Sequence, residues 1–223
     1  MQRFTTPAPV SVVLDVPTGH MRFIAADRTD TVVEVLPANA SKGRDVKAAE
    51  QMEVSYDDGV LRIEAPEAKN RLLGDSGSIE VVVRLPAGSR VKAKAADAEL
   101  RGVGRLGDVA FEGARATVKL DETAEAHLTL QAGDVSVGRL GGSARIDTHK
   151  GDIHVTEAVR GTVVLSTGSG DISVGAAAGV SASLDAGTSH GRVHNALKNT
   201  DGAAAGLNIH ATTGYGDITA RGL

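Results

Sequence analysis

The sequence contains no cysteine, so disulfide bonds and thiolate metal sites are excluded. Aromatic residues make up only 2% of the 223 residues, which argues against stacking platforms for bases or sugars. No apolar run approaches the roughly 18 residues of a membrane span, and the N-terminus MQRFTTPAPVS lacks the apolar core of a signal peptide. We therefore expect no direct membrane insertion and a cytoplasmic location.

An excess of charge of one sign is also missing. Lys and Arg number 24 against 28 Asp and Glu, which gives a net charge of -4 with both signs interspersed along the chain. This balance provides no electrostatic footprint for nucleic acid or anionic lipid. The core must come from Val, Ala, Leu and Ile, small residues that suit a thin, regularly layered interior.

What the sequence does contain is a repeat of a glycine, a polar residue and an apolar alternation. The copies are GDVSV (133–137), GDIHV (151–155), GDISV (170–174), GRVHN (191–195) and GDITA (216–220), with degenerate copies ADAEL (96–100) and ATVKL (116–120) before them. A second short alternation recurs between copies, as in VVLS (163–166). Each repeat therefore predicts a strand, a glycine turn, a second strand and a second turn.

The length of the repeat indicates the fold. Units of about 20 residues with two short strands match one coil of a β-solenoid, and residues 96–223 show a period of two with no helical stripe. We predict an all-β protein with a β-solenoid, parallel β-helix-like, over 96–223. Residues 1–95 alternate less regularly and predict an antiparallel β region that caps the solenoid and is continuous with it, so that the chain forms one structural unit.

Three local features of residues 1–95 carry expectations of their own. Asp45 is placed to cap a short helix over 45–52, and Asp57-Asp58-Gly59 predicts a hairpin turn. Leu72 and Leu73 lie inside a polar, glycine-flanked loop. They either tuck onto the adjacent sheet or contact a partner.

The glycines and aspartates of the repeat predict a structural turn motif. Glycine supplies positive φ or close backbone approach, and aspartate accepts backbone N–H groups across an Asx-turn. The motif residues are Gly133, Asp134, Gly151, Asp152, Gly170, Asp171, Gly191, Gly216 and Asp217. Stacking would align the carboxylates about 4.8 Å apart, where they repel unless solvated, hydrogen-bonded or bridged by a cation. Calcium-stabilised, adhesin-like binding is therefore an alternative, although no cofactor or metal site is assigned.

GTSHG (187–191) matches the G-x-S-x-G elbow of serine hydrolases, and Ser189, Asp201 and His210 follow the chain order of that triad. The elbow needs a helix after the serine, but the strand copy GRVHN follows it. We interpret GTSHG as a repeat turn, expect no catalytic residues and keep the hydrolase as an alternative. His154 and His194 share a repeat position with Ser173 between them, which places them about 9–10 Å apart, too far for one metal ion.

Several of these segments together resemble a known family. GSGDISV, SHGRVHN, TGYGDITARG (213–222) and SVVLDVPTGHMRFIAADRTDTVVEV are similar to the bacterial β-strand-repeat proteins called "putative adhesins", and look close to their soluble actinobacterial members. That domain family of unknown function is related to the toastrack domains linked with envelope-stress systems. The resemblance implies an all-β repeat fold with no established catalytic residues and no cofactor.

The predicted function is a non-enzymatic scaffold or protein-interaction module, in an envelope-stress or regulatory system. The last strand copy, GDITARGL (216–223), would leave an exposed solenoid end. Either the insertion 195–211 folds over that end, or the end pairs with a second copy. In the second case a homodimer forms through Ile218 and Leu223.

Overall fold

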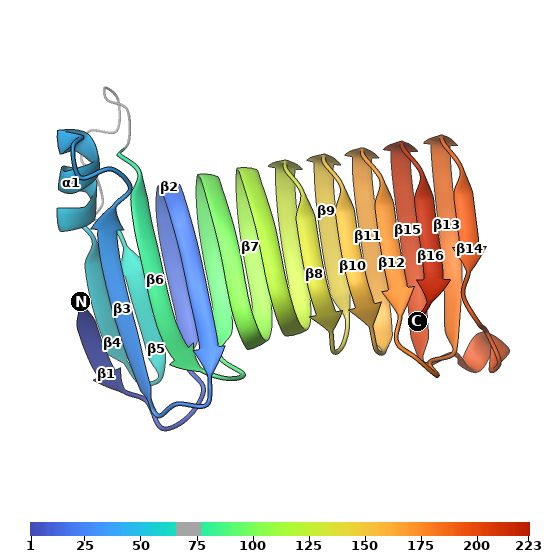
Figure 1. Cartoon of the computed structure of the whole chain (residues 1–223), viewed down its shortest axis with the longest axis horizontal. Helices are drawn as coiled ribbons and strands as arrows, with labels where there is room; N and C mark the ends of the chain where they lie inside the picture. The colour runs from blue at the N-terminus through green and yellow to red at the C-terminus, as the bar shows by residue number, and fades with distance from the viewer. Residues whose placement is uncertain (66–76) are drawn as a thin grey trace. The chain divides into compact units, whose positions relative to one another are not determined.

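The computed structural model describes residues 1–65 and 77–223 and consists mostly of β-strands (Figure 1). The chain forms two compact units, Met1–Ala116 and Thr117–Leu223, and the boundary falls inside strand β7 (Arg90–Ala132). The strands of the second unit pair in parallel coil by coil, so the all-β solenoid fold expected from the repeats is confirmed.

The N-terminal unit mixes antiparallel and parallel pairing. Its elements are β1 (Gln2–Thr5), β2 (Ser11–Ala26), β3 (Asp30–Pro37), α1 (Gly43–Glu50), β4 (Glu53–Asp57), β5 (Val60–Glu64), β6 (Ile79–Pro86) and the first part of β7. The antiparallel pairs are β1–β3, β3–β6 and β4–β5. By contrast, β2 pairs in parallel with β5, β6 and β7. Parallel stacking therefore begins at Ser11, inside the region where only antiparallel strands were expected, and the division at residue 95 stays a prediction.

The predicted helix and hairpin turn are both present. The helix runs from Gly43 to Glu50, but Asp45 is not its cap, because the N-cap residue is Lys42. The buried Asp45 carboxylate instead accepts the N–H of Ser78 at 3.0 Å and ties the helix to the segment before β6. Between β4 and β5, Asp58 and Gly59 both have positive φ (45° and 78°), the combination that a tight two-residue hairpin turn requires.

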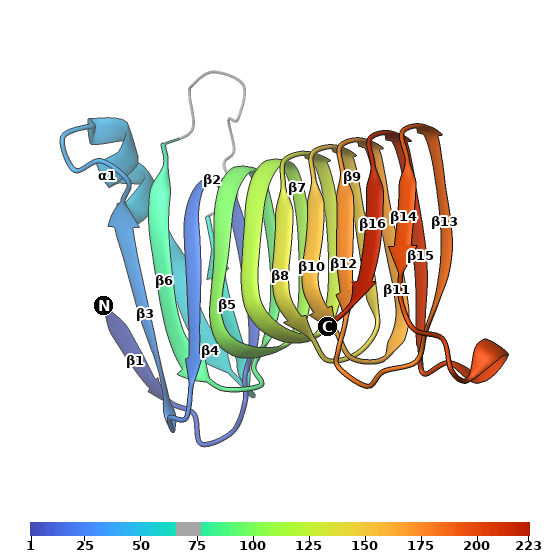
Figure 2. The same cartoon turned by 45° about the vertical axis from the view of Figure 1, so that its right-hand side comes forward.

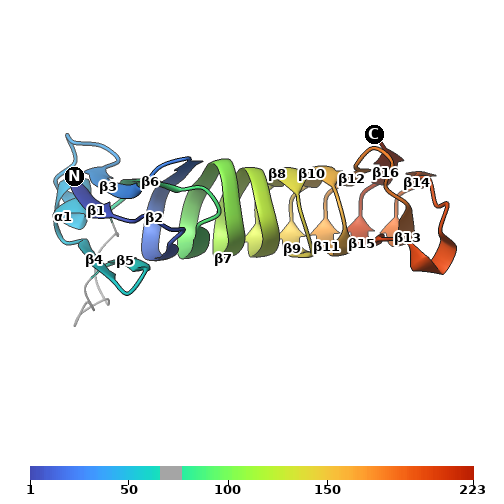
Figure 3. The ribbon, with the colours of Figure 1, turned by 90° about the horizontal axis from the view of Figure 1, so that it is seen from below.

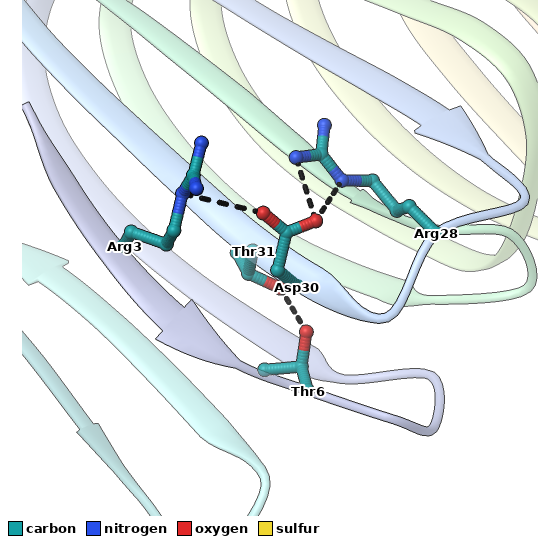
Figure 4. Close-up of polar contacts among 5 residues, drawn as sticks. All are labelled: Arg3, Thr6, Arg28, Asp30 and Thr31. Atoms are coloured by element: carbon teal, nitrogen blue, oxygen red, sulfur yellow. Dashed lines mark hydrogen bonds and ion pairs between the residues drawn. The ribbon is translucent and has the colours of Figure 1, made fainter.

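Polar and aromatic contacts hold the edge strand β1 in the N-terminal unit (Figure 4). Asp30 at the start of β3 lies between two arginines: Arg28 Nε donates to Oδ1 at 2.9 Å, and Arg3 Nε lies 3.4 Å from Oδ2. The buried hydroxyls of Thr6 and Thr31 share a hydrogen bond of 2.8 Å. On β1, Phe4 also packs against Tyr56 of β4, with ring centroids 5.4 Å apart. These contacts hold β1 in place against β3, with which it pairs.

The C-terminal unit is a flattened stack of coils with a sheet on each side (Figure 3). Its strands are β8 (Val135–Leu140), β9 (Ala144–Lys150), β10 (Ile153–Ala158), β11 (Gly161–Ser169), β12 (Ile172–Ala176), β13 (Ala182–His190), β14 (Val193–Ala196), β15 (Leu207–Tyr215) and β16 (Ile218–Gly222), with a short 3-10 helix over Gly202–Ala204. One sheet has the order β7, β9, β11, β15, β13, and the other has the order β7, β8, β10, β12, β16, β14. Every one of these pairs is parallel.

The order of the coils in space differs from their order along the chain (Figure 2). The last strand, β16, lies between β12 and β14, and β15 lies between β11 and β13. The C-terminal coil is thus inserted into the stack, and β13 with β14 forms its end. The expectation that β16 lies at an exposed end is wrong: Ile218 pairs with both Ile172 and Val193 and has no exposed surface.

The insertion expected to cover the end of the solenoid covers one corner of the terminal coil. The Ser181 hydroxyl accepts the N–H groups of Thr200 and Asp201, each at 3.1 Å. Next to it, Ala182 donates its N–H to the carbonyl of Lys198 at 3.0 Å. These contacts anchor the connection between β14 and β15 at the start of β13.

Candidate functional site

The aspartates of the repeat form a hydrogen-bonded ladder between coils. Oδ1 of Asp134 accepts the backbone N–H of Asp152 at 2.9 Å, and Oδ1 of Asp152 accepts that of Asp171 at 2.8 Å. Asp171 accepts from Asp217 at 2.7 Å, and Asp217 accepts from Arg192 at 2.8 Å. The bonds thus cross from coil to coil, and the predicted Asx-turn within one coil is wrong. Oδ1 of each carboxylate thus accepts one backbone N–H of the next coil.

The glycines of the turn allow the coils to approach closely. A Cβ on Gly170 would lie 2.1 Å from the carbonyl oxygen of Gly151, and one on Gly216 would lie 2.1 Å from that of Gly170. Gly191 would meet the carbonyl of Gly216 at 1.9 Å. Real side chains do not tolerate such separations, so glycine is required at each of these positions. These contacts link the turns in the order Gly151, Gly170, Gly216 and Gly191. The strands that follow these turns, β10, β12, β16 and β14, lie in the same order in their sheet.

A threonine completes the turn motif and was not singled out from the sequence. The hydroxyl of Thr167 donates to the carbonyl of Gly151, and that of Thr213 donates to the carbonyl of Gly170, both at 2.9 Å. Thr188 makes the same bond to Gly216 at 3.0 Å. The signal was present, because the turns read THKGD, TGSGD, TGYGD and TSHGR, which share a threonine three residues before the glycine.

Arg192 occupies the aspartate position of the last coil in the stack. Its own N–H is accepted by Asp217, whereas its side chain is 91% exposed and lies 3.9 Å from the Asp217 carboxylate. A carboxylate at this position would have no following coil whose N–H it could accept. The departure from the G-D pattern therefore marks the end of the ladder.

Ser189, Asp201 and His210 do not come together. Ser189 lies near the end of β13, whereas Asp201 lies beside Ser181 at its start. His210 is paired in register with Asp185, about 13 Å along the strand from Ser189 at a rise of ~3.3 Å per residue. Its Nδ1 lies 3.3 Å from the Asp185 carboxylate. Because β14 rather than a helix follows the serine, GTSHG is the repeat turn, as predicted.

The histidines lie on the outer faces of the coils. His154 and His194 are separated by Ser173 and Thr219, one strand more than expected, because β16 is inserted between β12 and β14. Across residues 1–65 and 77–223 no group of three His, Cys, Asp or Glu side chains is arranged to hold a metal ion. His190 instead stacks on the exposed Tyr215 ring of the neighbouring coil, with centroids 4.5 Å apart.

The four residues predicted to contact a partner differ in whether they are described and in how far they are exposed. Leu72 and Leu73 lie outside the described residues. Ile218 is fully buried, so it cannot contact a partner in this arrangement. Leu223 is 54% exposed, and its N–H is bonded to the carbonyl of Ala176.

Lys94 and Glu112, both in β7, form an exposed ion pair in the N-terminal unit. The Lys94 ammonium lies 2.7 Å from the Glu112 carboxylate. The hydrogen bond to Glu112 and its charge, helped by Asp15, raise the pKa of Lys94 above its ordinary value. Such a solvated pair is typical of an outer sheet face and is not a catalytic arrangement.

Among the comparisons with known proteins, one match identifies the family of the chain. The family model described as Toastrack DUF4097 matches residues 12–221. The chain belongs to this family. A crystal structure of a "putative adhesin" from Bacteroides fragilis matches the toastrack chain with a TM-score of 0.55 at 16% identity, covering 98% of this chain and 95% of that one. One from Parabacteroides distasonis gives 0.49 at 13% identity, with the same coverages.

The Bacteroides fragilis structure supports the fold alone, since its sequence identity is low. No curated protein matches the toastrack chain. In the described residues, no helix is both long and apolar enough to cross a membrane. The family description, Toastrack DUF4097, names no activity.

Proposed function

We propose that this toastrack protein is a scaffold or protein-interaction module that acts by binding another protein, in an envelope-stress or regulatory system. The observation that supports this proposal is that the repeated polar groups are hydrogen-bonded within the stack. The Asp171 carboxylate and the Thr167 hydroxyl, like their equivalents in other coils, bond to the neighbouring coil. The repeats therefore build a rigid stack and offer no cluster of reactive groups. The envelope-stress context is suggested only by the resemblance of the sequence to toastrack domains linked with such systems.

The experiment is quantitative capture with the immobilised chain from an extract of the source cells, followed by reconstitution with the purified partner. A specific partner should bind with fixed stoichiometry and be displaced by free chain. A parallel panel of ester substrates tests the alternative, with Ser189→Ala as the matched variant. Hydrolysis by the wild type that Ser189→Ala abolishes would overturn the proposal and establish the hydrolase.

A further inference from the structure

The terminal coil leaves apolar surface uncovered that every inner coil buries. Val193 is the last member of a row of side chains that point between the two sheets. The preceding members Val135, Ile153, Ile172 and Ile218 are at most 1% exposed, whereas Val193 is 44% exposed. The end of this row is therefore open, because no further coil of the described chain packs on Val193.

The backbone of the terminal coil is also open along β13. The carbonyl of Ser181 accepts the N–H of Leu207 on the β15 side, whereas the N–H of Ala182 points the opposite way, to Lys198. Because the polar backbone groups of successive residues alternate in direction along a strand, those of Leu184, Ala186 and Thr188 also face away from β15. Within the described chain β13 pairs with β15 and with no other strand. These groups form a template for one more strand.

Two exposed charges of opposite sign, one within β13 and one just beyond it, decide which strand fits. The Asp185 side chain is 85% exposed near the middle of β13, and the Arg192 side chain is 91% exposed just beyond its C-terminal end. A parallel copy of β13 would bring like charges together, whereas an antiparallel copy places Asp185 near Arg192 of its partner. In addition, position 192 carries an arginine, so it has no carboxylate that could accept the backbone N–H of a further parallel coil. The edge is therefore complementary to itself in the antiparallel direction.

We propose that the open edge of β13 pairs antiparallel with β13 of a second copy of the chain, across a two-fold axis normal to the two sheets. The same rotation brings together the two β14 strands and covers Val193. Such a pairing uses the same surface on both chains, so it closes as a dimer and does not propagate into a fibre. The inference rests on the proposed function as an interaction module and names a second copy as one partner of that module.

Sedimentation equilibrium of the purified chain over a range of concentrations tests the pairing, with a monomer–dimer equilibrium expected. Ala186→Pro adds a ring at an N–H that faces the open edge, so it should abolish the dimer without removing a bond to β15. Circular dichroism and thermal unfolding of the monomer provide its folding control. A wild type that stays monomeric at all concentrations would overturn the inference.

Charge exchange provides a second test that does not depend on the proline variant. Asp185→Arg and Arg192→Asp should each weaken the dimer roughly tenfold, and the double variant should restore it, because the pair is re-formed with opposite polarity. His210→Asn is the matched control, since it removes the other contact of Asp185 and should leave the dimer unchanged. Dimerisation that none of these substitutions alters contradicts the pairing. The measurement uses the purified chain alone, so its failure is distinct from a failure to capture another protein.

Discussion

The carboxylate of Asp171 accepts the backbone N–H of Asp217, 46 residues further along the chain, at 2.7 Å. Arg192, which comes between them in sequence, lies one step further out and is bonded to Asp217. This relationship fixes the position of the C-terminal coil inside the stack. It predicts that the turn residues stabilise the fold according to their place in the stack and not their place in the sequence.

Removing a carboxylate from inside the ladder should destabilise the fold. Asp171→Ala leaves the N–H of Asp217 without its acceptor, and we expect the free energy of unfolding to fall by about 1 kcal/mol. Arg192→Ala is the control at the terminal position, where no following N–H depends on the side chain, and it should change stability by less than about 0.5 kcal/mol. Urea denaturation measures both. Equal losses in the two variants would contradict the ladder.

A methyl group at a stacking glycine should be much more damaging. The Cβ of Gly170→Ala would lie 2.1 Å from a carbonyl oxygen of the neighbouring coil, at a φ of 151° that side chains rarely adopt. We expect a loss of at least about 3 kcal/mol, or failure to fold. Gly222→Ala is the control, because nothing lies within 4 Å of its added Cβ. If Gly170→Ala unfolds at the same urea concentration as Gly222→Ala, the close approach of the coils is wrong.

The buried threonine hydroxyl can be tested by an isosteric change. Thr167→Val removes the donor to the carbonyl of Gly151 at a site that is 4% exposed, so it should cost about 1 kcal/mol. Thr212→Val, at an exposed position of the neighbouring coil, should be close to neutral. Thermal unfolding of the two variants and the wild type compares them directly, and a neutral Thr167→Val would remove the threonine from the turn motif.

The sequence predicted what is local in this fold and missed what depends on stacking. Each G-D turn with its alternating strand carries its own signal, so the coils and the role of GTSHG could be predicted. The order of the coils could not, because every repeat offers the same edges to its neighbours. The long interval between Arg192 and Asp217 was interpreted as an insertion before a final coil. Likewise, an aspartate can accept an N–H within its own turn or from the next coil, and only the stacked structure distinguishes the two.

Deleting the C-terminal coil should be far more damaging than trimming a chain end. Removal of residues 207–223 uncovers Leu165 and Ile172, which are buried in the neighbouring coil, and removes the partners of β13 and β14. We expect the C-terminal unit to lose at least about 5 kcal/mol of stability. The deletion removes five buried apolar side chains, which are Leu207, Ile209, Ala211, Ile218 and Ala220. Deletion of the exposed residues 221–223 is the control and should have a small effect. Hydrogen exchange of the C-terminal unit measures the difference.

Thiol cross-linking tests the stacking order most directly, since the chain has no cysteine of its own. Ser173 and His194 each pair in register with Thr219 but not with one another. A short thiol-specific cross-linker should therefore join Ser173→Cys to Thr219→Cys, and Thr219→Cys to His194→Cys, in two double variants. The third double variant, Ser173→Cys with His194→Cys, should not be joined, because its residues lie two strands apart, or about 9.6 Å. Efficient joining of that third pair, with none of the first, would show that the coils stack in chain order and would contradict the inserted C-terminal coil.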